Sequence, residues 1–118
     1  MIRKQSDCRI DERPEMRGGN GTVRIEHLFE PGSELKSPVR LCAKLYLEPG
    51  VSIGFHRHEN EEEIFVIVKG HGEIDDNGTV RQVTAGDSVL TGNGSGHAVR
   101  NNGNETLEIL AVISKYAE

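Results

Sequence analysis

The chain has 118 residues, enough for one domain with a hydrophobic core but too few for two. Its net charge is −5 and no run of lysine or arginine interrupts the acidic background, so we do not expect nucleic acid as a partner. No apolar stretch approaches the ~18 residues that span a bilayer, and Met1–Arg9 is too polar for a signal peptide. We therefore expect a cytoplasmic protein without membrane contact, whose cysteines, Cys8 and Cys42, are reduced thiols.

The first 21 residues are polar and end in a turn-forming cluster, Gly18-Gly19-Asn20-Gly21. This composition is typical of an exposed terminal segment rather than of a core element. The sequence therefore predicts an N-terminal arm over residues 1–21 and a single β-domain over residues 22–118.

Strand patterns follow the arm. Thr22–Phe29 is the first, and the proline-containing loop Glu30–Pro38 separates it from Val39–Glu48. The second pattern alternates regularly. One face carries Leu41, Ala43, Leu45 and Leu47, and the other carries Cys42, Lys44, Tyr46 and Glu48. Pro49 and Gly50 break the alternation that links this strand to the next, so either face can line the interior.

The second half of the chain reads as short strands between turns. Asn77-Gly78 lies between two strand-like runs and is a strong hairpin signal. Further strands are expected over Ser88–Thr91, His97–Asn101 and Thr106–Ser114. No stretch has a helical apolar face, so the sequence predicts an all-β barrel or sandwich.

The segment Gly50–Gly70 contains a candidate metal site. His56 and His58 are two residues apart, so on a strand both imidazoles project from one face, roughly 7 Å apart at Cα. Glu63 opens the strong strand Ile64–Val68 and is a plausible third ligand. The alternative is a solvated loop, in which histidines simply lie beside several acidic residues.

Strand alternation also predicts an exposed apolar row. If Glu63 points inward, then Phe65 and Ile67 do so as well, and the aliphatic side chains between them face outward, namely Ile64, Val66 and Val68. Such a row requires a cover, which is either the N-terminal arm or a second subunit. By the same alternation His97 and Val99 point inward together.

Two motifs resemble the signatures of small single-domain bacterial cupins. The pattern G-x5-H-x-H-x4-E-x6-G is complete, with Gly50, His56, His58, Glu63 and Gly70. The second pattern, G-x5-P-x-G-x2-H-x3-N, is matched by Gly86, Gly94, His97 and Asn101, with Gly92 in place of the usual proline. That substitution favours a less rigid loop before His97.

This resemblance implies a double-stranded β-helix, or jelly-roll, barrel with one divalent transition metal per chain. The implied ligands are His56, His58, Glu63 and His97. Such a donor set suits manganese, iron, cobalt, nickel, copper or zinc without selecting among them. Small cupins are commonly dimers, so the resemblance also favours a homodimer.

The implied function is a metal-dependent enzyme acting on a small organic molecule that chelates the metal, by a dioxygenase- or isomerase-type reaction. The alternative is a non-catalytic module that binds a small molecule or metal. The sequence assigns no catalytic residue. His27 and His71 are expected to lie outside the site, and Arg57 is expected at the surface because it alternates with the two ligand histidines.

Overall fold

The computed structural model describes residues 1–117, and the protein folds within them into ten β-strands and two short 3-10 turns. The strands are β1 (Arg9–Pro14), β2 (Thr22–His27), β3 (Val39–Leu47), β4 (Ser52–Arg57), β5 (Glu61–Lys69), β6 (His71–Asp76), β7 (Thr79–Thr84), β8 (Ser88–Gly92), β9 (Gly96–Arg100) and β10 (Leu107–Lys115). The 3-10 turns are η1 (Gln5–Asp7) and η2 (Met16–Gly18). No helix among the described residues is long and apolar enough to cross a membrane.

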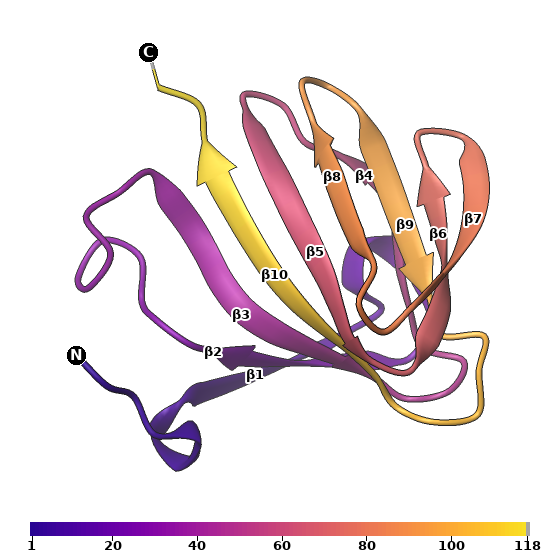
Figure 1. The fold of residues 1–118 in the computed structure, drawn as a ribbon, viewed down its shortest axis with the longest axis horizontal. Helices are drawn as coiled ribbons and strands as arrows, with labels where there is room; N and C mark the ends of the chain where they lie inside the picture. The colour runs from indigo at the N-terminus through magenta and orange to yellow at the C-terminus, as the bar shows by residue number, and fades with distance from the viewer. Residues whose placement is uncertain (118) are drawn as a thin grey trace.

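The strands form two antiparallel sheets. The larger has the order β1-β2-β3-β10-β5-β8 and the smaller has the order β4-β9-β6-β7. The two sheets curve around a common interior, and the chain crosses repeatedly from one to the other (Figure 1). The all-β, jelly-roll prediction is confirmed.

The core lies between the sheets and follows the predicted alternation. Ala43, Leu45 and Leu47 are buried on β3, which shows that the leucine face of this strand lines the interior. They pack with inward residues of β10, to which β3 is paired along its length. Tyr46, on the opposite face of β3, donates a hydrogen bond from its hydroxyl group to Glu26 (3.0 Å).

The β5 strand also alternates as predicted. Glu63, Phe65 and Ile67 are buried, whereas Ile64 and Val68 are 40% and 44% exposed. Leu90, which is opposite Ile64 on β8, is 64% exposed. The N-terminal segment does not cover this row, because β1 lies at the far end of the six-stranded sheet from β5 and β8.

The hairpin at Asn77-Gly78 forms as the sequence predicts. Both turn residues have positive φ, 50° for Asn77 and 100° for Gly78, as a two-residue hairpin turn requires. The amide of Gly78 donates to the side chain of Asp75 (2.8 Å). The two strands it joins are β6 and β7, at the edge of the smaller sheet.

Residues 1–21 are all exposed or half-buried, but part of the segment forms a paired strand and not a free arm. β1 pairs antiparallel with β2, from Arg9 opposite His27 to Pro14 opposite Thr22, and η2 follows directly. The strand gave no sequence signal because its residues, Arg-Ile-Asp-Glu-Arg-Pro, offer no apolar face. The segment is therefore part of the larger sheet and contributes to its inner surface.

Candidate metal centre and its pocket

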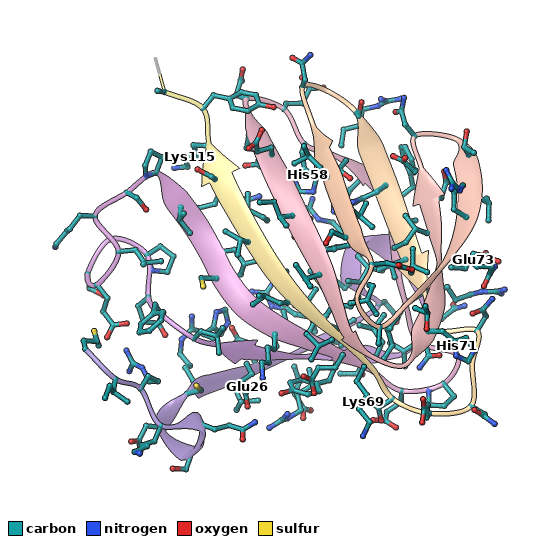
Figure 2. The ribbon with its side chains drawn as sticks, in the orientation of Figure 1. Glu26, His58, Lys69, His71, Glu73 and Lys115 are labelled. Atoms are coloured by element: carbon teal, nitrogen blue, oxygen red, sulfur yellow. The ribbon has the colours of Figure 1, made fainter. Side chains whose placement is uncertain are left out.

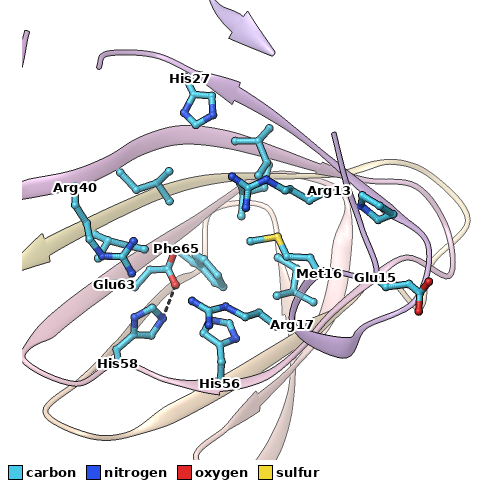
Figure 3. Close-up of a pocket in the computed structure, with 16 residues that line it drawn as sticks. Arg13, Glu15, Met16, Arg17, His27, Arg40, His56, His58, Glu63 and Phe65 are labelled. Atoms are coloured by element: carbon cyan, nitrogen blue, oxygen red, sulfur yellow. Dashed lines mark ion pairs between the residues drawn. The ribbon is translucent and has the colours of Figure 1, made fainter. Parts of the chain in front are cut away.

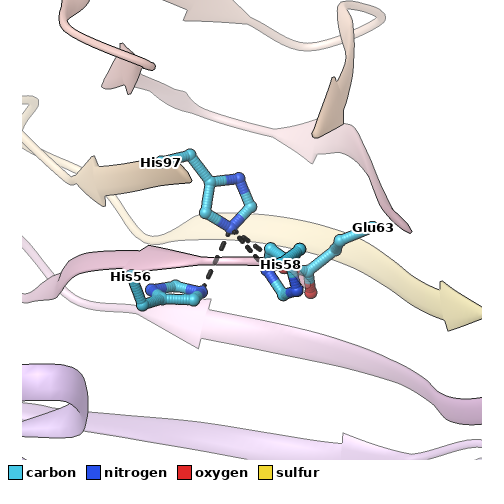
Figure 4. Close-up of side chains that lie close together, drawn as sticks. All are labelled: His56, His58, Glu63 and His97. Carbon is cyan, nitrogen blue, oxygen red and sulfur yellow. Dashed lines mark hydrogen bonds and ion pairs between the residues drawn. The ribbon is translucent and has the colours of Figure 1, made fainter. Parts of the chain in front are cut away.

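Three strands bring the four predicted ligands together. His56 lies on β4 directly opposite His97 on β9, His58 immediately follows β4, and Glu63 lies on β5. One donor atom from each residue lies within 4.8 Å of those of the others. Figure 4 shows the four side chains converging from these strands. Their convergence is the geometry that the ligand prediction requires, whereas a solvated loop would leave them dispersed.

The donor atoms crowd around one point. Glu63 Oε1 lies 2.8 Å from His58 Nε2 and 3.0 Å from His97 Nε2. The Nε2 atom of His97 also lies 3.1 Å from that of His58 and 3.2 Å from that of His56. His58, Glu63 and His97 are buried. Three imidazoles and a carboxylate buried at these separations are stabilised by a positive charge between them, which is either a proton or a metal ion.

The contacts of the Nδ1 atoms, which face away from the cluster, indicate how the histidine rings can bind a metal ion. His56 Nδ1 faces the carbonyl oxygen of Gly54 (2.8 Å), and His58 Nδ1 faces the carboxylate of Glu61 (2.6 Å). Both partners are acceptors, so each Nδ1 atom can keep its proton while Nε2 gives up its own to a metal, which leaves a neutral ring with an inward Nε2 lone pair. Inward lone pairs beside a carboxylate are the donor set of a divalent transition metal. The residues therefore fit the metal ion that the motifs imply.

The charge states of the cluster favour metal binding. Burial alone would raise the pKa of Glu63, but the hydrogen bonds to His58 and His97 and the charges of these two rings together lower it. Burial lowers the pKa of His56, which keeps its ring neutral at pH 7. The hydrogen bond to Glu63 raises the pKa of His58, so in the metal-free protein a proton competes for that ring.

Glu61 and Phe65 hold two of the ligands in place. The Glu61 carboxylate accepts from Arg40 Nε (2.6 Å) and Nη2 (2.7 Å) as well as from His58. These partners, Arg40 first, lower the pKa of Glu61 to about 2. The Phe65 ring stacks on the His97 ring, with centroids 4.7 Å apart and planes inclined by 14°. The sequence did not single out Glu61, because three other glutamates lie within two residues of it and nothing in the pattern distinguishes it from them.

The metal cluster opens onto a cavity of about 380 Å³ between the two sheets. Figure 3 shows its wall, which includes three arginines absent from the sequence prediction: Arg13, Arg17 and Arg40. Arg13 and Arg17 come from β1 and η2, the segment that the sequence assigns to an arm. Leu41, Leu45 and Ile113 supply apolar lining from the larger sheet.

His27 also lines this cavity, against expectation. It is 8% exposed, and its Nε2 lies 2.8 Å from Asp11 Oδ2. Asp11 lies on β1, and the pairing of β1 with β2, which the sequence did not predict, brings it next to His27. The His27 hydrogen bond is the main cause of the lowered pKa of Asp11.

The remaining candidates lie where the sequence places them. His71 is exposed at the start of β6, well away from His58 (Figure 2). Arg57 is exposed, and its guanidinium lies over the Phe55 ring while donating to the carbonyl oxygen of Gly94 (3.1 Å).

Gly92, in place of proline, does not leave the loop before His97 free. A Cβ atom at Gly92 would lie 2.7 Å from the hydroxyl oxygen of Tyr116, which also accepts a hydrogen bond from the Asn93 amide (2.8 Å). Glycine at position 92 therefore lets Tyr116 approach the loop and hold it through the hydrogen bond from the Asn93 amide.

Comparison with known proteins agrees with this description. The Cupin domain family matches residues 44–113, so the chain belongs to the cupins. It is 40% identical over 113 residues to a Thermotoga maritima protein named "oxalate-binding protein", covering 96% of this chain and 93% of the relative.

Solved structures show the same fold. The crystal structure of a predicted oxalate decarboxylase from Thermotoga maritima has a TM-score of 0.93 and 39% identity, covering 98% of this chain and 100% of the other. A cupin 2 conserved barrel domain protein from Salinispora arenicola has a TM-score of 0.72 and 28% identity, covering 98% and 88%.

Proposed function

We propose that this cupin binds a small chelating carboxylate of the oxalate type through one divalent metal ion held by His56, His58, Glu63 and His97. The observation that carries the proposal is the opening of this four-ligand cluster onto a cavity whose wall contains three arginines. The name of the Thermotoga maritima relative supports the same ligand class.

The donor count suits a chelating ligand. Four protein ligands leave up to two positions of an octahedral ion, and two oxygens of adjacent carboxylates fill two neighbouring positions. The bound metal would supply positive charge and Lewis acidity to those oxygens. The chain's own part is to fix the ligand geometry and to surround the anion with guanidinium groups, which hydrogen-bond carboxylates in a matching fork.

Binding is the function we favour over catalysis, because the pocket wall offers few groups for proton transfer. Its acidic residues are Glu63, which is a proposed metal ligand, and Glu15, whose side chain is exposed and extends away from the cavity (Figure 3).

One observation favours an enzyme as the second candidate. His27 lies in the same wall with its Nε2 2.8 Å from Asp11 Oδ2, and an imidazole held by a carboxylate is a general base that an isomerase-type reaction can use. A dioxygenase-type reaction would instead need oxygen at the open metal positions.

Calorimetry on protein loaded with manganese(II) or cobalt(II) tests the proposal. We expect oxalate to bind with one ligand per metal, and acetate, which cannot chelate through two carboxylates, to bind at least about tenfold more weakly. Metal-loaded protein that gives no heat with oxalate would exclude the proposed ligand class. Oxygen consumption or chemical conversion of the ligand, lost in His27→Asn, would establish the enzyme instead.

We also propose a homodimer that covers the outer apolar row of Ile64, Val68 and Leu90. A 118-residue chain gains by burying such a row against a second copy, since the row has no cover within the described residues. Light scattering should give about twice the 13.0 kDa chain mass. Leu90→Lys should give a monomer, whereas Val80→Lys, at an equally exposed site on β7, should leave the mass unchanged. A monomeric wild-type protein would exclude the dimer.

A further inference from the structure

We propose that Arg13 and Arg17 form a second anion subsite, which binds a carboxylate of the ligand that the metal does not hold. The ligand class that fits both subsites is a 2-oxo dicarboxylate, whose 2-oxo acid end chelates the metal while its far carboxylate reaches the arginines. This inference rests on the proposed metal-dependent carboxylate binding and extends it beyond oxalate.

The first argument is charge. Of the three arginines in the cavity wall, Arg40 is held by a two-pronged ion pair with Glu61. Arg13 and Arg17 have no carboxylate partner among residues 1–117; the ion pairs there involve other residues. Two unpaired guanidinium groups in the pocket of a chain with net charge −5 complement an anionic ligand. Figure 3 shows both side chains extending from the N-terminal segment toward the cavity, with Arg17 beside His56.

The second argument is the backbone that carries Arg17. Arg17 has φ 55° and ψ 29°, and Glu15 has φ 49° and ψ 44°, so two non-glycine residues within three are left-handed. Such residues cost free energy and persist only where their surroundings fix them. The strained turn directs the Arg17 side chain into the pocket wall. A role of Arg17 in ligand binding would explain why the protein keeps this unfavourable backbone conformation.

Close backbone packing fixes this turn against the metal-binding strand. A Cβ atom on Gly54 would lie 2.1 Å from the carbonyl oxygen of Arg17, and one on Gly19 would lie 2.2 Å from that of Ser52. The Asn20 amide donates to Ser52 Oγ (2.8 Å), and the Ser52 amide donates to the Asn20 carbonyl oxygen (2.9 Å). Because Gly54 and the ligand His56 share β4, the turn and the metal site are positioned by one strand. The subsite is therefore preorganised relative to the metal.

The third argument is size. Oxalate has six non-hydrogen atoms and fills roughly the volume of two to three water molecules, or about 60–90 Å³. The cavity of about 380 Å³ leaves room for a longer ligand beyond the metal. A second carboxylate separated from the chelating end by a short carbon chain would fill part of that room and meet the two arginines.

The test compares three chelators by calorimetry on manganese-loaded protein: oxalate, pyruvate and 2-oxoglutarate. Pyruvate and 2-oxoglutarate share the chelating end, and only the second has a far carboxylate. We expect wild-type protein to bind 2-oxoglutarate about tenfold or more tightly than pyruvate, since a charge-assisted pair contributes on this scale. In Arg13→Gln/Arg17→Gln the ratio of 2-oxoglutarate affinity to pyruvate affinity should fall to less than about threefold, with metal content unchanged.

Arg81→Gln, which removes an exposed arginine of β7 outside this cavity, is the matched control and should keep the wild-type ratio. Oxalate and pyruvate binding without any preference for 2-oxoglutarate would overturn the subsite and leave the proposed function standing. A preference that survives in the double variant would also overturn the subsite. Failure of all three chelators to bind metal-loaded wild-type protein would overturn the proposed function itself, and the subsite with it.

Discussion

The two walls of the cavity are built in different ways. The metal wall consists of side chains on β4, β5 and β9 and of His58, directly after β4, and three of the four candidate ligands are buried. The opposite wall includes the N-terminal segment, whose two cavity arginines, Arg13 and Arg17, are exposed. The difference teaches that the proposed metal site depends on the barrel core, whereas the proposed choice of ligand depends on a polar segment outside that core.

The attachment of the N-terminal segment shows the same contrast. Arg9 donates two hydrogen bonds to the carboxylate of Glu30, at 3.0 and 3.1 Å, and Arg3 pairs with Glu34. Gln5 contacts the buried carboxylate of Glu26, which also accepts from Tyr46. Ion pairs and hydrogen bonds at partly exposed positions stabilise less than core burial does. The segment is therefore the less stable wall.

Removing a ligand should have the largest effect. We expect His97→Ala to lower metal affinity more than about 100-fold, beyond the loss typical of residues that only support a ligand. His71→Ala, an exposed control, should bind metal as wild type does. Elemental analysis and competition with a chelator measure both. If the two variants lost metal equally, the ligand assignment would be wrong.

Weakening the support of a ligand should have a smaller effect on the same wall. Glu61→Gln removes the charge that fixes the His58 ring, and we expect metal affinity to fall about tenfold. Glu59→Gln removes an exposed carboxylate one residue from His58 and should change metal affinity little. Equal affinities for wild type and Glu61→Gln would show that the Glu61 contact does not position His58.

A substitution where the two walls pack together should disturb the N-terminal segment without disturbing the metal site. Gly54→Ala would place a Cβ atom against the Arg17 carbonyl oxygen and displace η2, at a cost of about 1–3 kcal/mol. Thermal unfolding should show a lower Tm. Metal affinity per folded chain should stay within about threefold of wild type, because His56 keeps its partner strand β9. An unchanged Tm would contradict the close packing of η2 on β4.

The smallest expected effect concerns the anchor of the N-terminal segment. Burial and the hydrogen bond to Glu26 raise the pKa of Tyr46 to about 12. Between the unfolded pKa near ~10 and this value, the unfolded chain releases the phenolic proton while the folded chain keeps it, so stability falls as pH rises. The Tyr46→Phe variant has no phenolic proton at this position, so its stability should not show this fall between pH ~10 and pH ~12.

Denaturant unfolding at several pH values measures the difference. Below pH ~10 we expect Tyr46→Phe to be less stable than wild type by about 1 kcal/mol, through loss of the hydrogen bond. The gap should narrow toward pH ~12. A constant gap across this range would show that Tyr46 ionises equally in both states.

The strands of the metal wall and the four side chains that converge there were predictable from sequence, because the signals for them are local. Alternation along β3 and β5 reports which side chains meet the core, because each strand buries one face. The spacing of His56, His58 and Glu63 places them close to either end of the short connection between β4 and β5, and the match to the second cupin motif added His97. Glu61 was not distinguishable from its acidic neighbours, since its role depends on Arg40, which is 21 residues away.

The sequence by itself determined the all-β fold, the inward face of β5 and the four side chains that converge at the candidate metal site, because each follows from periodicity or from a short motif. Only the tertiary structure decided the other wall. β1 has no apolar face, so its pairing with β2 follows from polar contacts between residues far apart in the chain, such as Asp11 with His27. Likewise Arg17 reaches the cavity because Gly54, 37 residues later, has no side chain to obstruct η2. Contacts of this kind leave no periodic trace in the sequence, and they shape the part of the pocket to which we assign ligand choice.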